Sequence, residues 1–64
     1  MIFKFEFGTL VTDETSGFLG TIIARCEYSD NSVQYLVQPY NDDFTVKLKS
    51  EWFSENGLIK AIIN

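Results

Sequence analysis

The sequence contains no histidine, one cysteine and one proline, and these shortages exclude several classes of protein. Histidine is the commonest general base and the commonest metal ligand, so its absence argues against acid–base catalysis and against a transition-metal site. The single cysteine, Cys26, excludes an intrachain disulfide and favours a reducing compartment. Without a histidine partner, and within an expected strand, Cys26 is interpreted as a buried or half-buried small residue and not as a nucleophile.

Long apolar runs and helical periodicity are also missing. No run approaches the ~20 apolar residues that cross a bilayer. The first seven residues are apolar but alternate with Lys4 and Glu6, which is typical of a strand and not of a signal peptide. We therefore expect a soluble, cytoplasmic protein with no membrane partner.

Positive charge is scarce, because five basic residues face nine acidic ones and the net charge is −4. Such a balance repels duplex DNA unless the basic residues gather on one face. In the sequence they are dispersed, at Lys4, Arg25, Lys47, Lys49 and Lys60. Nucleic acid is therefore an improbable partner, and the simplest role of the net charge is solubility.

Apolar residues, by contrast, are abundant: 45% of the 64 residues are hydrophobic and 16% are aromatic. This length corresponds to one domain, residues 1–64, with a small core. Such a core has no room for a deep internal pocket. A ligand site should therefore be a surface groove or lie between copies of the protein.

Apolar and polar residues alternate with period two in several short segments, which predicts strands. In the first of them, Phe3, Phe5 and Phe7 are expected to share one face. Turn formers separate the segments, and Ser29–Ser32 predicts a hairpin. Gly17 is expected at a positive φ, and Gly20 at a bulge or a close approach of two backbones. The expected strands cover residues 2–7, 9–12, 18–28, 33–38, 44–49 and 58–63, with a single 3₁₀ turn at 54–57.

Three motifs resemble parts of SH3-like barrels of the KOW type. Gly8–Asp13 reads G-x-x-V-x-D, and Gly17–Ile22 is similar to the G-x-x-G-x-[VI] opening of a hairpin in those barrels. Glu51–Leu58 is similar to their aromatic strand end, 3₁₀ turn and final strand. The resemblance implies an all-β fold, an SH3-like small barrel of five or six antiparallel strands with one short 3₁₀ turn.

The order of further segments is similar to that in small uncharacterised proteins of tailed bacteriophages. These segments are Thr15–Gly20, Ala24–Tyr28, Tyr35–Pro39 and Glu51–Phe53. The resemblance implies no activity, because a fold does not fix a function.

Five residues are candidates for ligand binding: Arg25, Tyr28, Tyr35, Tyr40 and Trp52. Arg25 is interpreted first as a structural partner of Glu27, Glu51 or Glu55, and alternatively as an anion-binding guanidinium. The resemblance to SH3-like barrels implies that exposed aromatic rings beside the long hairpin form a ligand groove, in which they can stack a base while an arginine holds its phosphate. For Trp52 a place in the core is the favoured interpretation, and for Tyr40 an exposed one.

Apart from these five residues, only paired carboxylates suggest catalysis or metal binding. They occur at Asp13-Glu14 and Asp42-Asp43, both in expected turns, where solvated acids are common. A weak calcium site at Asp42-Asp43 is conceivable but lacks the ligand spacing of a calcium loop. The sequence therefore predicts no catalytic residues, no metal site and no cofactor, and thus a protein that is not an enzyme.

The first and last expected strands carry more apolar residues than one face can bury, which favours a homo-oligomer. The favoured hypothesis is a non-catalytic phage accessory protein, an oligomeric binding module that neutralises a host factor. That factor is either a host protein or a small nucleotide signal held between protomers. The alternatives are a KOW-like nucleic-acid-binding module and a structural adaptor of the virion.

Overall fold

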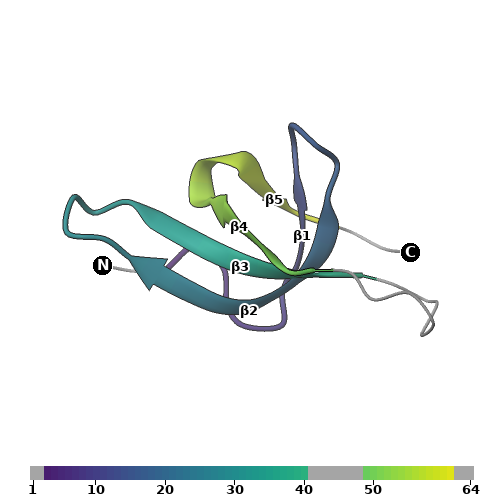
Figure 1. Cartoon of the computed structure of the whole chain (residues 1–64), viewed down its shortest axis with the longest axis horizontal. Helices are drawn as coiled ribbons and strands as arrows, with labels where there is room; N and C mark the ends of the chain where they lie inside the picture. Colours follow the sequence, from purple (N-terminus) through teal and green to yellow (C-terminus); the bar gives the residue numbers. More distant parts are fainter. Residues whose placement is uncertain (1–2, 41–48, 62–64) are drawn as a thin grey trace.

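The structure is a computed structural model that describes residues 3–40 and 49–61. Five strands in these ranges form one open antiparallel sheet in the order β4-β3-β2-β1-β5 (Figure 1). The expected all-β class, with five strands and a 3₁₀ turn, is confirmed. The turn, η1 (Glu55–Gly57), joins the two edge strands. The strands are β1 (Leu10–Asp13), β2 (Leu19–Glu27), β3 (Val33–Pro39), β4 (Glu51–Ser54) and β5 (Leu58–Lys60).

The turns form where short polar residues and glycine allow them. Between β2 and β3, Asn31 has a φ of 70°, and the Asp30 carboxylate accepts hydrogen bonds from the backbone N–H and hydroxyl of Ser32. These two bonds lower the pKa of the exposed Asp30 carboxyl group. These contacts confirm the predicted Ser29–Ser32 hairpin. Between β1 and β2, Gly17 has the expected positive φ, 76°.

Gly20 and a β-bulge mark two places where β2 departs from a regular strand. A Cβ atom on Gly20 would overlap the carbonyl oxygen of Gln38 on β3, which confirms the close backbone approach. Farther along, the register shifts between Ile22 and Ala24, so Ile23 is an extra residue. A bulge increases local twist and bends its strand, which lets β2 curve around the core.

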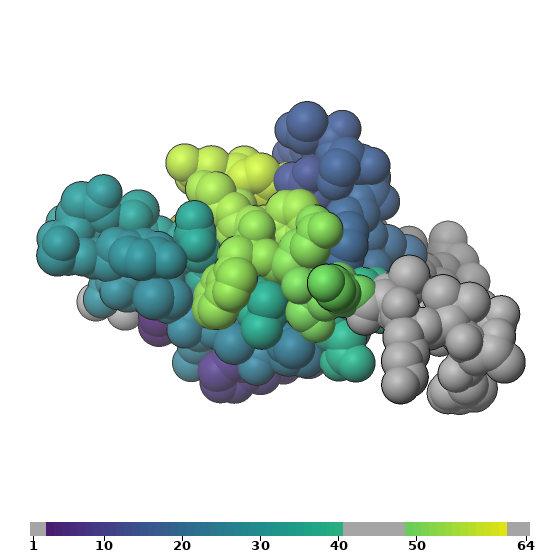
Figure 2. Space-filling view, in the orientation of Figure 1, coloured from purple at the N-terminus to yellow at the C-terminus, as the bar shows by residue number. Residues whose placement is uncertain are grey.

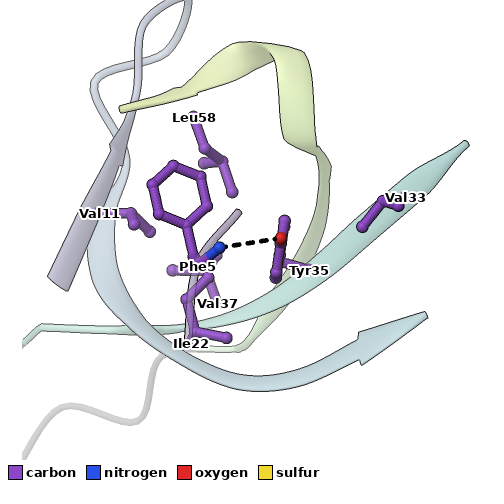
Figure 3. Close-up of a cluster of buried hydrophobic side chains, with 7 residues drawn as sticks. All are labelled: Phe5, Val11, Ile22, Val33, Tyr35, Val37 and Leu58. Carbon is purple, nitrogen blue, oxygen red and sulfur yellow. Dashed lines mark hydrogen bonds between the residues drawn. The ribbon is translucent and has the colours of Figure 1, made fainter. Parts of the chain in front are cut away.

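The core lies inside this curve, where the strands and η1 surround it (Figure 3). It is built from inward-facing residues of four strands and one residue that precedes them. Phe3, Phe18 and Phe53 pack against it from its margins. The buried apolar side chains are Phe5, Val11, Ile22, Val33, Tyr35, Val37 and Leu58.

The expected first strand is wrong for the part the structure describes. Residues 3–9 are irregular: Phe5 enters the core, whereas Phe7 is 60% exposed. Both sides of β1, the next strand along the chain, are occupied by β2 and β5, so the segment cannot form a hairpin with it. The Phe5 N–H therefore bonds to a side chain, the Tyr35 hydroxyl, and the segment turns at Gly8, where φ is 83°.

Other predictions fall partly or wholly outside the described residues. The expected strand 44–49 lies there except for Lys49, and so do Lys47 and the pair Asp42-Asp43. The last strand ends at Lys60, and residues 62–64 are outside the described part. In the described ranges, no helix has the length and apolarity that a membrane span requires.

Candidate functional site

The face of the sheet turned away from the core carries a row of apolar side chains across three strands. Residues that pair directly in antiparallel strands lie on the same face. Ala24 on β2 pairs with Leu36 on β3, and Leu36 pairs with Trp52 on β4. Their neighbours Tyr35 and Val37 point into the core, so this row points outward. Alternation thus places an indole ring on the outer surface.

Trp52 is 49% exposed, so the expectation that it lies in the core is wrong. The next residue along β4, Phe53, pairs with Tyr35 and packs against the core and the ring of Phe18, with 5.0 Å between ring centroids. Because Trp52 and Phe53 are adjacent and both aromatic, alternation alone does not show which of them faces the core. The pairing of β4 with β3 places Phe53 inward and Trp52 outward.

We call the four residues Ile23, Ala24, Leu36 and Trp52 the outer patch. Ala24 and Leu36 are half-buried, and Ile23 is exposed because it is the extra residue of the bulge. Strands β2, β3 and β4 all contribute to it. Figure 2 shows β4 on the surface facing the viewer, with the β2–β3 hairpin extending to one side.

Polar groups border the outer patch towards the β2–β3 hairpin. The pair Cys26 and Gln34 forms the next row of the same face, and Gln34 also pairs with Ser54. The exposed Tyr28 donates a hydrogen bond from its hydroxyl to Gln34 Oε1 at 3.1 Å. The neighbouring Cys26 side chain raises the pKa of Tyr28. The expectation of a half-buried, free Cys26 is confirmed.

Arg25 lies on the opposite face of β2 from Ala24, and in the part of the chain that the structure describes it pairs with no carboxylate. Ion pairs with Glu27, Glu51 or Glu55 were expected, but within residues 3–40 and 49–61 Arg25 makes none. Its guanidinium carbon is instead 4.4 Å from the ring centroids of both Phe3 and Phe7. Cation–π contacts with the N-terminal segment replace the expected ion pair.

Tyr35 is fully buried, so its ring has no surface on which a ligand can stack. Its hydroxyl donates to Glu55 Oε2 at 2.6 Å. The same hydroxyl accepts the Phe5 N–H at 3.1 Å (Figure 3). Glu55 Oε2 also accepts the Lys4 N–H at 3.2 Å. Burial, and next the bond to Glu55, raise the pKa of Tyr35. The role of Tyr35 is to tie the N-terminal segment to η1.

Tyr40 is 50% exposed, as expected, and follows β3. It lines a hollow of about 360 Å³ together with residues of the β1–β2 hairpin and of the start of β4. The other lining residues are Phe18, Leu19, Pro39, Lys49 and Glu51. None of the outer-patch residues lines this hollow.

The five predicted residues therefore do not converge in one chain. Tyr28 and Trp52 share the outer face, whereas Arg25 pairs with Tyr35, whose side chain enters the core. Sequence reasoning missed Ile23 and Leu36, although the alternation of residues 33–38 places Leu36 opposite the core residues. The bulge that exposes Ile23 has no clear sequence signal. Among the described residues, no three acidic or cysteine side chains are grouped so that they can hold a metal ion.

Comparisons with known proteins add no family to this description. No model of a protein family, no curated protein and no solved structure matches the chain.

Proposed function

We propose that this chain is a non-catalytic binding module and that a protein partner docks on the outer patch. The observation that carries the proposal is the half-exposed Trp52, which is aligned with Leu36 and Ala24 on one face. Protein interfaces concentrate their binding energy in a few aromatic anchors, and tryptophan is prominent among them. Burial of the indole ring against a partner explains why a small acidic protein has a tryptophan on its surface.

The surroundings of Trp52 fit the anatomy of an interface. An apolar centre is bordered by neutral polar groups, Gln34, Ser54 and the Tyr28 hydroxyl. Interface cores are depleted in charge, whereas their rims are polar. No charged residue occupies the row Ala24, Leu36 and Trp52, so a partner surface can cover it without desolvating an ion.

The nature of the partner follows from the phage resemblance. On that resemblance we infer that the chain acts as a phage accessory protein, whose partner is a host protein that binding neutralises. The alternative partner, a small nucleotide held between protomers by the five candidate residues, has less support, because Tyr35 is buried and Arg25 does not share a face with Tyr28 and Trp52. An outer patch of this kind recognises a complementary apolar protein surface.

Trp52→Ser tests this proposal by removing the anchor. Immobilised wild type, Trp52→Ser and Tyr40→Ser are compared as baits for host-cell proteins, and binding of each retained protein is measured by titration. Tyr40→Ser is the matched control, since Tyr40 is an aromatic residue as exposed as Trp52 but lines the hollow beside Pro39, which no residue of the outer patch lines. We expect Trp52→Ser to weaken partner binding by about thirtyfold, as loss of a hot spot does.

Two results contradict the proposal. One is a partner that binds the wild type and Trp52→Ser equally. The other is a partner that both variants lose to the same extent, which indicates a general loss of apolar surface.

A further inference from the structure

The guanidinium of Arg25 is flanked by two aromatic rings. The centroids of Phe3 and Phe7 each lie 4.4 Å from its central carbon. Contacts of this kind orient the flat guanidinium group and remove part of its hydration. The side chain of Arg25 is therefore held in place before any ligand arrives.

Most of the hydrogen-bonding capacity of this guanidinium is unused. Nη1 donates to the Phe5 carbonyl oxygen at a long distance, 3.4 Å. Within residues 3–40 and 49–61 the group makes no other hydrogen bond and no ion pair. An arginine has five N–H donors, which leaves several without a protein partner.

These unused donors face solvent. In the described part of the chain, no buried side-chain nitrogen or oxygen lacks a hydrogen-bond partner. The unpartnered nitrogens of the half-buried Arg25 are therefore accessible at the surface. The residue presents an oriented, charged and open set of donors.

We propose that Arg25, held by Phe3 and Phe7, is a binding site for an oxyanion, a carboxylate or phosphate group. Such groups accept two parallel N–H bonds from a guanidinium, which a fixed plane favours. The site is separate from the outer patch, because Arg25 pairs with the inward-facing Tyr35 whereas Ala24 pairs with the outward-facing Leu36. It thus extends the proposed function to a second surface.

Nitrogen-15 NMR tests the site directly. Arg25 is the only arginine in the sequence, so its Nε–H signal needs no assignment among other arginines. Sodium phosphate, sodium acetate and sodium chloride are titrated separately at matched ionic strength. We expect a saturable shift of the Nε–H signal with phosphate or acetate and none with chloride. The ratio of the two affinities identifies the preferred group.

Three variants distinguish binding at the Arg25 site from a non-specific attraction of anions to positive charge. Arg25→Lys keeps the charge but loses the planar donors, and we expect the affinity, followed on the Gly8 amide signal, to fall about tenfold. Phe7→Ala, which frees the guanidinium, is expected to weaken binding severalfold. Lys60→Gln, the matched control, removes a positive charge on β5 and should leave the affinity within twofold.

The proposal is overturned by shifts that rise linearly and equally with all three salts, which indicate screening alone. Equal affinity of the wild type and Arg25→Lys also overturns it, as does a loss in Lys60→Gln as large as that in Arg25→Lys.

Discussion

At the scale of single residues, the Tyr35 hydroxyl links three parts of the chain that are far apart in sequence. It donates to Glu55 in η1 and accepts the N–H of Phe5 in the N-terminal segment. Both bonds form at a side chain that is fully buried. A buried polar group whose partner is removed costs more free energy than the hydrogen bond itself contributes. This hydroxyl is therefore more important for stability than its size suggests.

Tyr35→Phe is expected to lower the free energy of unfolding by about 1–3 kcal/mol, because the Phe5 N–H is left buried without an acceptor. Urea unfolding followed by circular dichroism measures the change. Tyr28→Phe is the matched control, since its hydroxyl bonds to Gln34 at the exposed end of the hairpin. We expect that variant to change the same quantity by less than about 0.5 kcal/mol. If the two variants lost the same free energy of unfolding, the buried hydroxyl of Tyr35 would contribute no more to stability than the exposed hydroxyl of Tyr28.

At the scale of elements, β2 determines the curvature of the sheet. It is the longest strand, it pairs with both β1 and β3, and it holds both irregular positions, Gly20 and Ile23. Gly20 lets the backbone of β3 approach closely at one end, and the bulge bends the strand in its middle. Both positions therefore contribute to the curve of β2 around the core.

Gly20→Ala is expected to destabilise the protein strongly, by about 3 kcal/mol or more, because the added Cβ overlaps the backbone of Gln38 and lies 2.8 Å from Val37 Cγ1. Backbone atoms in a sheet cannot move aside as a flexible side chain can. Gly17→Asn serves as control, since Gly17 has open space around it and asparagine tolerates its positive φ. Thermal unfolding compares the two variants. A stable Gly20→Ala protein would contradict the close approach.

The alternation of residues predicted most of these elements, because one face of each strand is buried. Residues 33–38 alternate without interruption, and the structure buries Val33, Tyr35 and Val37 as a regular strand requires. The residues around Gly17 and Ser29–Ser32 favour turns by their own local chemistry. Local information was therefore sufficient for β2, β3 and the hairpin that joins them.

Where the prediction was wrong, the outcome depended on contacts between distant residues. Phe3, Phe5 and Phe7 alternate as a strand does, but β1 has no free side with which they can pair. The outward position of Trp52 is set by its register with Leu36. Likewise, the rings beside Arg25 come from a segment about 20 residues earlier in the chain. Periodicity in one segment contains none of this information.

At the scale of the whole molecule, apolar residues remain exposed on several sides. Phe7, Ile23, Trp52 and Ile59 are each more than 40% exposed. Strand β5 pairs with β1 on one side, and within the described residues no strand pairs with its other side. Exposed edges with apolar side chains favour pairing between copies of a chain. We propose that two copies associate through the β5 edge.

Ile59→Ser tests this association. Its side chain is 44% exposed on β5, and burying an isoleucine contributes about 1.5–3 kcal/mol, so the substitution should weaken the association by at least tenfold. Sedimentation velocity over a range of concentrations measures the effect. Thr9→Ser, which leaves β5 unchanged, is the control. A wild type that stays monomeric at every concentration would refute the proposed association.

The contacts that join the two ends of the chain also determine when the protein can fold. Lys4 bonds to Glu55, and Asp13 pairs with Leu58, which is itself fully buried in the core. A chain growing from its N-terminus therefore cannot complete this core until Leu58 has been synthesised. Folds with such non-local contacts form in milliseconds to seconds, roughly, and not in microseconds. During synthesis, the aromatic residues that precede β2 stay exposed until β5 has been made.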